Sequence, residues 1–355
     1  MTPGTDPESL AEWSSCYRMR PVSPPRIMAR TAQLRDHDEE TGRVGLMRRN
    51  DDLNGKTIVV TGASSGFGRG AAIALGARGA HVVLAARRGE VLEEVAAQIA
   101  ASGGSAVAVP TDVSDSEAVE NLAAAAEEHF GPIDVWINNA AVGVMGLFWE
   151  VPLADHARLV DVDLKGMIFG AHVALRRFTA RGEGVLVNVG SVAGEVPLAY
   201  QSTYSAVKAG ITSLGRSLTE ELRLAGLDET VKVGTILPWA ADTPWWDHVG
   251  NYTGHAPRLT AMDDPDLIVD AIVDACTNPD QERPVGPKGR AAHTSHRVFR
   301  ELTERFSGTL SRAEIGNGAR VPDTAGAIHE PVSVGTAVHG DTRARMVEED
   351  ADPGS

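Results

Sequence analysis

The stretch TYSAVKAG at 203–210 places a tyrosine four positions before a lysine. Four residues are about one helical turn, so Tyr204 and Lys208 would lie on the same face of a helix. A phenol beside an ammonium can be an ordinary surface pair, or an acid whose pKa is lowered from about 10 for proton transfer. The second interpretation requires a substrate and a cofactor site, which other parts of the chain must supply.

A glycine-rich turn follows the first apolar segment, KTIVVTG at 56–62, and continues as ASSGFGRG. A tight turn, close backbone approach and helix packing need residues without a Cβ, and the helix beyond offers N–H groups to phosphate. A plain strand-to-helix connection would also explain the glycines, but their position after the first strand favours nucleotide binding. The cofactor-binding residues predicted in this turn are Gly62, Ser64, Ser65, Gly66, Phe67 and Gly68.

Short apolar segments alternate with longer helical patterns through the middle of the chain. Near-continuous apolar strands separated by helices predict a parallel sheet covered on both faces, a doubly wound α/β fold. Such a sheet binds its ligand beyond the carboxyl ends of its strands. The predicted strands are 56–62, 80–86, 105–111, 133–139, 184–190 and 231–237.

Three regions differ in composition. Residues 53–308 carry the alternating pattern and are predicted to form a single catalytic domain. Residues 1–52 lack sustained periodicity, and residues 309–355 are rich in Gly, Thr, Ala and acids, so both are expected to be flexible extensions.

The composition excludes several kinds of partner. The chain is 43% hydrophobic with a formal net charge of −15, which argues against binding to nucleic acid or an anionic membrane. Its two cysteines lie far apart, as expected for a reduced cytoplasmic protein. We expect no membrane span, no signal peptide and, because the histidines are scattered, no metal site.

The second predicted strand ends in LAARR. An acid at this point usually meets a free ribose 2′-hydroxyl, whereas a 2′-phosphate requires arginine. Here Ala86 stands where the acid would be, and Arg87 and Arg88 follow, with Arg69 in the glycine turn. The arginines could instead be the solvated start of the next helix, but their chemistry favours NADP(H) over NAD(H).

Five motifs, in this order, resemble the short-chain dehydrogenase/reductase family: TGASSGFG, DV at 112–113, NNA at 138–140, GSVAG at 190–194 and YSAVK at 204–208. The resemblance implies a Rossmann fold, a nicotinamide cofactor and hydride transfer between it and a small-molecule carbonyl or alcohol. It also implies a homodimer or homotetramer joined through the helices at 153–181 and 203–225.

The resemblance assigns a role to each matching residue. Tyr204 would be the acid/base, Lys208 would lower its pKa and bind the nicotinamide ribose, and Ser191 would hold the substrate oxygen. Asp112 would lie near the adenine. The cofactor pocket would be completed by Asp112, Val113, Asn138, Ala140, Pro238 and Thr243.

The sequence departs from the family pattern in three places, of which the first two affect the catalytic site and the cofactor pocket. Asp163, in LVDVDLKGMIFG, occupies the place of an asparagine whose backbone carbonyl is thought to hold a water linked to the lysine. A carbonyl survives the substitution, so we expect Asp163 to be tolerated as a fourth catalytic residue and to shift the pH profile through its charge. The usual NNAG is NNAA here, so Ala141 would tighten the cofactor wall.

The third departure is the tryptophan-rich segment LPWAADTPWWDHVGNY, in which Trp239 replaces a glycine. Its tryptophans either pack against the core or face an apolar substrate, and the sequence leaves both possibilities open. A hydrophobic wall favours apolar ketones, aldehydes or ring alcohols over sugars. The residues expected to form it are Met145, Leu147, Phe148, Trp149, Trp239, Trp245 and Trp246.

Two other functions remain open. A non-catalytic NADP(H)-binding sensor or scaffold would keep the fold, but it would not need serine, tyrosine and lysine together. An epimerase or dehydratase would keep the cofactor, but the segment 240–308 is short for the substrate domain of such enzymes.

Overall fold

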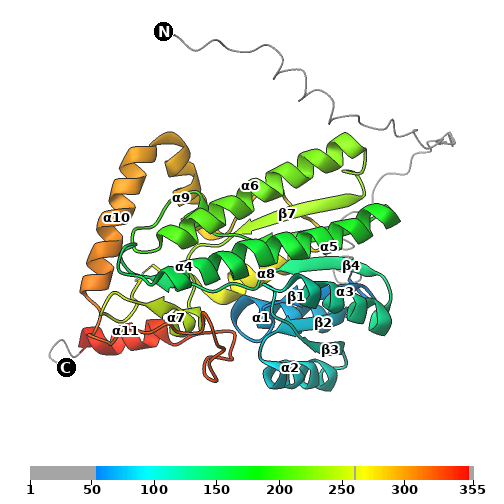
Figure 1. The fold of residues 1–355 in the computed structure, drawn as a ribbon, viewed down its shortest axis with the longest axis horizontal. Coiled ribbons are helices and arrows are strands. Elements are labelled where there is room, and N and C mark those ends of the chain that lie inside the picture. The colour runs from blue at the N-terminus through cyan, green and yellow to red at the C-terminus, as the bar shows by residue number, and fades with distance from the viewer. Residues whose placement is uncertain (1–52, 260, 352–355) are drawn as a thin grey trace, which may run out of the picture. The chain divides into compact units, whose positions relative to one another are not determined.

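The structure is a computed structural model that describes residues 53–259 and 261–351. A parallel sheet of seven strands lies at its centre, in the order β3-β2-β1-β4-β6-β7-β9 (Figure 1). Its strands are β1 (Thr57–Thr61), β2 (His81–Ala86), β3 (Ser105–Pro110), β4 (Ile133–Asn138), β6 (Gly184–Val189), β7 (Val231–Leu237) and β9 (Arg283–Pro284). The six predicted strands are present, and the two-residue β9 was too short to leave a pattern in the sequence.

Helices cover both faces of this sheet. On one face, α1 (Gly66–Gly76), α2 (Gly89–Ala101) and α8 (Pro265–Ala275) share an apolar core with alternate residues of β1 and β2. On the other, α3 (Ser116–Phe130) and α5 (Gly166–Arg181) pack against the remaining residues, and α6 (Ser202–Ala225) contributes Leu222 to this core. All five residues of β1 are buried, as a strand covered on both sides requires. The predicted doubly wound fold is confirmed.

Two of the helices that cover the sheet, α3 and α8, begin at polar caps. Asp115 accepts hydrogen bonds from the backbone N–H groups of Glu117 and Ala118, and so begins α3. Asp264 caps α8 in the same way, with Pro265 in the first turn. None of the helices in the described ranges is long and apolar enough to cross a membrane.

Smaller elements surround the carboxyl edge of the sheet. The strands β5 (Val144–Met145) and β8 (Gly250–Asn251) pair with each other, and α7 (Trp245–His248) lies between β7 and β8 in the chain. Between β5 and α5 come α4 (Leu153–Leu159) and η2 (Val160–Lys165), a π-helical segment. A single 3₁₀ turn, η3 (Val192–Gly194), connects β6 toward α6.

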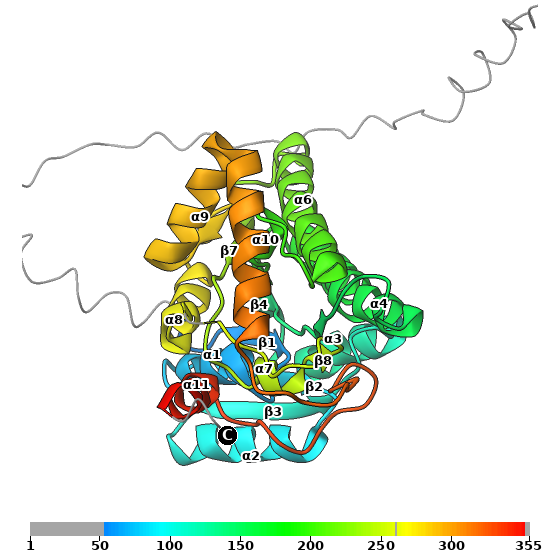
Figure 2. The same ribbon diagram turned by 90° about the vertical axis from the view of Figure 1, so that its left-hand side faces the viewer.

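The C-terminal region differs from the flexible tail expected for residues 309–355. The helix α9 (Gly286–Val298) is followed by α10 (Arg300–Gly316), which runs through the predicted boundary at 308, and the chain ends its described part in α11 (Thr342–Ala351). Figure 2 shows the intervening segment looping from the end of α10 to α11. Four buried apolar residues hold this polar stretch to the rest of the protein: Ile315, Ala327, Ile328 and Met346. The extension predicted at 1–52 lies outside the described residues.

Candidate active site

A cavity of about 600 Å³ opens at the carboxyl edge of the sheet. Its walls come from the segments that follow β1, β2, β4, β6 and β7, and from the first turns of α6. Of the residues predicted from the sequence, the cavity is lined by Gly62, Ser64, Ser65, Gly66, Phe67, Arg87, Arg88, Asp112, Val113, Ala140, Ser191, Tyr204, Lys208, Pro238 and Thr243. Gly68, Asn138 and Asp163 are buried behind these walls.

The glycine turn has the close contacts that dinucleotide binding requires. A Cβ on Gly68 would lie 2.3 Å from the carbonyl oxygen of Gly62, and one on Gly62, whose φ is +70°, would lie 2.8 Å from Cα of Ala140. Asn139 fixes the turn from the neighbouring strand, because its amide donates to the carbonyl of Thr61 at 2.9 Å. Asn139 lies in the NNA motif, but the sequence did not identify its role.

Tyr204 and Lys208 occupy the first turns of α6 and lie against each other, as their spacing predicted. The Lys208 Nζ atom is 5.3 Å from the centre of the Tyr204 ring. It also donates to the carbonyl of Val189 at 3.5 Å and lies 3.5 Å from Asp163 Oδ2. Lys208 is only 2% exposed, so its charge is held inside the protein by these partners.

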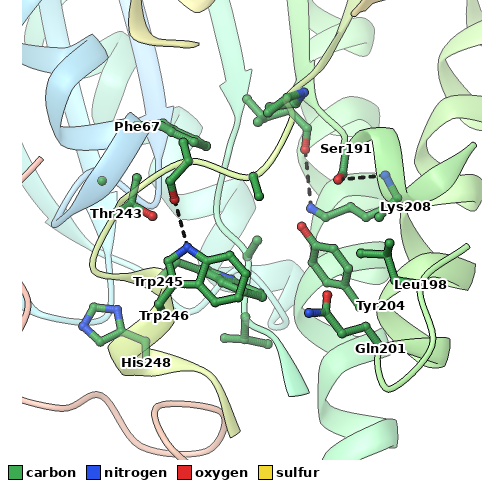
Figure 3. Close-up of a pocket in the computed structure, with 18 of the residues that line it drawn as sticks. Phe67, Ser191, Leu198, Gln201, Tyr204, Lys208, Thr243, Trp245, Trp246 and His248 are labelled. Carbon is green, nitrogen blue, oxygen red and sulfur yellow. Dashed lines mark hydrogen bonds between the residues drawn. The ribbon is translucent and has the colours of Figure 1, made fainter. Parts of the chain in front are cut away.

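Ser191 follows β6 and faces the same space as Tyr204 (Figure 3). Its hydroxyl accepts a hydrogen bond from the N–H of Ala193 at 3.1 Å, which fixes the rotamer at the start of η3. The tight packing of η3 on α6 depends on Gly194, where a Cβ would come within 2.6 Å of the Lys208 backbone. This contact brings the serine and the tyrosine together.

The Lys208 ammonium was expected to lower the pKa of Tyr204, but this pKa is raised above its ordinary value. Burial raises this pKa, and the opposing effects of Lys208 and of the hydrogen bond with Ser191 do not cancel it. The charge of Asp163 raises it further. Lys208 therefore acts in the predicted direction, but desolvation of the phenol outweighs it, and the pKa lies above its ordinary value.

Asp163 sits in the π-helical segment η2, which widens the helix by one residue and turns this side chain inward. Its Oδ1 accepts from the N–H of Val142 at 2.7 Å, and its Oδ2 faces Lys208. Asp163 is fully buried. Burial raises its pKa to about 6, against the lowering effects of Lys208 and the Val142 N–H.

Asn138 is buried beneath the cavity. Its amide donates to the carbonyl of Met167 and to Asn188 Oδ1, both at 3.1 Å, and its oxygen accepts from Trp136 Nε1 at 2.8 Å. These bonds join β4, β6 and α5 in the middle of the fold. Asn138 thus supports the sheet centre, as predicted, without lining the cofactor pocket.

Asp112 lies at the predicted adenine side of the cavity and is held by Arg158, a residue that the sequence did not single out. The Arg158 Nη2 atom donates to Asp112 Oδ2 at 2.6 Å. Burial raises the pKa of Asp112, but the hydrogen bonds from Ser114 and Arg158 outweigh it and hold this pKa below its ordinary value. The carboxylate is therefore charged at neutral pH.

Arg87 and Arg88 turn into the cavity and not into solvent. Arg88 Nη2 donates to the hydroxyls of Ser64 and Ser65, both at 2.9 Å, which ties the second strand to the glycine turn. Arg87 Nη2 donates to the backbone carbonyl of Ala327 at 2.6 Å. Burial lowers the pKa of both guanidinium groups. These contacts are incompatible with a solvated helix start.

The sequence left open whether the tryptophans of the segment 237–252 pack in the core or face the cavity, and the structure shows both arrangements. Trp246 is buried and its Nε1 donates to the carbonyl of Ala241 at 2.9 Å, so it packs in the core, although one side of it also lines the cavity. Trp245 lies on the cavity side, with its ring 5.5 Å from that of Tyr204 (Figure 3). Trp239 does both, because it lines the cavity and donates to Ala261 at 2.9 Å.

The hydrophobic wall expected from residues 145–149 is only partly present. Met145 lines the cavity, but Leu147 does not, and Phe148 and Trp149 are 56% and 78% exposed. Their loop points them into solvent. One face of α10 supplies apolar lining residues instead: Leu310, Ile315 and, at the rim, Phe306, which is itself 69% exposed.

Comparison with known proteins agrees with this geometry. The model of the family described as "short chain dehydrogenase" matches residues 56–252. The "Uncharacterized oxidoreductase YxnA" of Bacillus subtilis is 34% identical over 257 residues, which cover 72% of each chain. The chain belongs to the short chain dehydrogenase family, and it is an oxidoreductase with a nucleotide-binding Rossmann fold.

Other relatives show the range of the family. The "3beta-hydroxysteroid dehydrogenase 1" of Eggerthella lenta is 38% identical over 55% of this chain and 74% of its own. The "Probable oxidoreductase EphD" of Mycobacterium tuberculosis is 33% identical over 79% of this chain, which spans only 50% of that protein.

Two solved structures share the fold. A short-chain dehydrogenase/reductase from Burkholderia phymatum in complex with NAD has a TM-score of 0.63 and 27% identity, and the match covers 71% of this chain and 96% of that one. A metagenomic short-chain oxidoreductase in complex with NADP has a TM-score of 0.54 and 32% identity, over 65% and 94%.

Proposed function

We propose that the protein transfers hydride between NADP(H) and a carbonyl/alcohol pair, with Tyr204 as the acid/base. The observation that carries this proposal is the convergence of Ser191, Tyr204 and Lys208 on the same cavity as the glycine turn. A protein that only binds a nucleotide has no use for the three groups together.

The residues present fit a dinucleotide. The turn is kept tight by Gly62 and Gly68, where a Cβ would collide with neighbouring protein atoms, and α1 begins at Gly66, where its N–H groups can meet a phosphate. The bound dinucleotide would supply or accept the hydride. The relatives of known structure bind NAD in one case and NADP in another, and the preference for NADP(H) rests on Arg87 and Arg88.

The proton step follows from the electrostatics of Tyr204. Its raised pKa keeps the phenol protonated at neutral pH, and a protonated phenol is the form that can give a proton to a carbonyl oxygen. Ser191 would hold that oxygen beside the phenol. Lys208, a buried cation near the ring, would stabilise the phenolate left after the transfer.

The substrate is proposed to be an apolar ketone, aldehyde or ring alcohol. Trp245 lies beside Tyr204, and Met145, Phe306 and Leu310 line the same cavity. Such a lining favours apolar ligands with few polar groups. The relative named as a 3β-hydroxysteroid dehydrogenase is consistent with a ring alcohol.

We also propose a homodimer or homotetramer that uses α5 and α6. A shallow groove between these helices is lined by Ile168, Leu175, Leu214 and Leu218, and Ile168 is 41% exposed. Light scattering on the purified full chain tests this, and a monomer at micromolar concentration would contradict it.

The proposed activity is tested by following NADPH oxidation with a panel of carbonyls of increasing apolar size. We expect turnover to be faster with NADPH than with NADH, and with cyclic apolar ketones than with sugars. Faster turnover with NADH would overturn the argument from Arg87 and Arg88. Tight NADPH binding without turnover across the whole panel would indicate a sensor or scaffold.

A further inference from the structure

The segment Thr324 to Gly340, here called the strap, lies in the chain between α10 and α11 (Figure 2). It contributes Ala327, Pro331 and Val332 to the lining of the cavity. Its backbone carbonyls meet the groups that would bind phosphate. The N–H of Gly66, the first residue of α1, donates to the carbonyl of Ala337 at 2.9 Å. Arg69 Nη1 donates to the carbonyl of Thr336 at 2.8 Å.

Both arginines that follow β2 are bound in the same manner. Arg87 donates to the carbonyls of Ala327 at 2.6 Å and His329 at 2.7 Å. Arg88 donates to those of Val332 at 3.3 Å and Val334 at 3.2 Å. The strap thus uses four of the donors that the proposed function assigns to the cofactor or its surroundings, and it does so through backbone atoms alone.

The strap is anchored at both ends as well as by these donors. In its first half, Ile328 is fully buried in a cluster with Val144, Val151 and Leu159. Thr324 exchanges two backbone hydrogen bonds with Asn251 of β8, at 2.7 and 2.9 Å.

The other end of the strap is held by Asp242. The carbonyl of Asp242 accepts from Gly340 at 2.8 Å, and its carboxylate accepts from the N–H of Thr342 at 3.1 Å, at the start of α11. Between its two ends, the strap is held by the arginine and Gly66 contacts.

We propose that the strap is an intrasteric competitor of the dinucleotide, held on the phosphate-binding donors until the cofactor displaces it. This inference rests on the proposed function. The Gly66 N–H has a single proton to donate, so it cannot hold the Ala337 carbonyl and a phosphate oxygen together. The same donors make stronger, charge-assisted bonds to phosphate than to a neutral carbonyl, so a cofactor can replace the strap.

Because only molecules with an open strap can bind the cofactor, the apparent dissociation constant equals the intrinsic one divided by the fraction of molecules in which the strap is open. Loosening an anchor that does not touch the cofactor donors should therefore tighten cofactor binding. The side chain of Ile328 is such an anchor, because it is buried in the cluster with Val144, Val151 and Leu159. The Ile328 carbonyl, which accepts from Arg87 Nη1 at 3.4 Å, is kept when the side chain is shortened. Val334 is the matched control, since its side chain is 63% exposed and the hydrogen bond from Arg88 goes to its backbone carbonyl, which the substitution keeps.

The test is the dissociation constant for NADPH, measured by fluorescence titration of the full chain for wild type, Ile328→Ala and Val334→Ala. We expect Ile328→Ala to bind at least about tenfold more tightly, since losing a buried isoleucine side chain weakens the closed state, and Val334→Ala to bind like wild type. Equal or weaker binding by Ile328→Ala would overturn the inference and leave the proposed function standing. No binding of NADPH or NADH by any of the three would overturn both.

Hydrogen exchange on wild type gives a second readout that does not depend on a variant. The amides of Thr324, Ala327 and Gly340 are hydrogen-bonded to Asn251, His248 and Asp242. We expect NADPH to speed their exchange, because it would lift the strap. Slower exchange would mean that the strap closes over the cofactor, and it would overturn the competitive role.

Discussion

Replacing Asp163 with asparagine removes a buried charge and leaves a side chain of nearly the same shape. The side-chain oxygen of the asparagine could still accept from the Val142 N–H, which Asp163 Oδ1 binds at 2.7 Å, and the backbone carbonyl would be unchanged. The carboxylate that faces Lys208 at 3.5 Å would be lost. The substitution therefore isolates the effect of charge in the relay behind Tyr204.

The magnitude follows from the pKa of Asp163, which is raised from 3.8 to about 6. A raised pKa means that the protonated carboxyl is favoured in the folded state. Its contribution to stability is fully present below pH about 4 and is lost as the pH rises through about 6. The full effect is about 3 kcal/mol, and about 1 kcal/mol of it falls between pH 7.5 and pH 5.

Urea unfolding at both pH values measures this effect as the difference in free energy of unfolding between wild type and Asp163→Asn. We expect that difference to move by about 1 kcal/mol in favour of wild type on going from pH 7.5 to 5. Asp161→Asn is the matched control, because Asp161 lies in the same segment η2 but is 40% exposed and paired with Lys165.

If the difference in free energy of unfolding between wild type and Asp163→Asn stays constant with pH, the pKa of Asp163 is not raised in the folded protein. Activity gives an independent check, because the negative charge of Asp163 raises the pKa of Tyr204. Asp163→Asn should therefore move the Tyr204 limb of the pH–rate profile to lower pH. An unchanged activity together with an unchanged profile would show that Asp163 has no part in the relay.

Three further predictions concern the cavity. Arg88→Ala should lower the ratio of NADPH affinity to NADH affinity by about tenfold or more. This ratio does not depend on the strap, because the strap competes with NADPH and NADH alike. An unchanged ratio in paired titrations would contradict the role of Arg88 in binding the 2′-phosphate. Phe306→Ala should raise KM for large apolar ketones with little change in kcat. Leu302→Ala should leave steady-state kinetics unchanged, because Leu302 is as exposed as Phe306, at 69%, but lies outside the cavity. Equal effects of the two substitutions would exclude α10 as a substrate wall. Gly68→Ala should weaken NADPH binding because its Cβ would lie 2.3 Å from the Gly62 carbonyl, and wild-type affinity in a calorimetric titration would refute that contact.

Local patterns in the sequence predicted the sheet and the central residues of the site. Strand and helix patterns are set by neighbouring residues, and the one-turn spacing of Tyr204 and Lys208 is enough to place them on one face of α6. The glycine turn is predictable for the same reason. Ser191 and Tyr204 come together because both follow elements whose order the α/β pattern specifies.

Features that depend on distant contacts could not be read in this way. Arg87 binds a backbone carbonyl 240 positions later, and a carbonyl leaves no signature in the residue type. Composition alone therefore made the strap look like a flexible tail. The direction of the Tyr204 pKa was wrong for a related reason, since burial arises from tertiary packing and outweighs the neighbouring lysine.

The central claim, that Tyr204 donates the proton in NADP(H)-dependent carbonyl reduction, is tested most directly by Tyr204→Phe. The measurement is the single-turnover rate of NADPH oxidation with the best carbonyl of the panel, with the NADPH dissociation constant determined on the same sample. We expect the rate to fall by about 10²–10⁴-fold while NADPH affinity stays within a few-fold of wild type. A rate equal to that of wild type, with the cofactor bound, would contradict it.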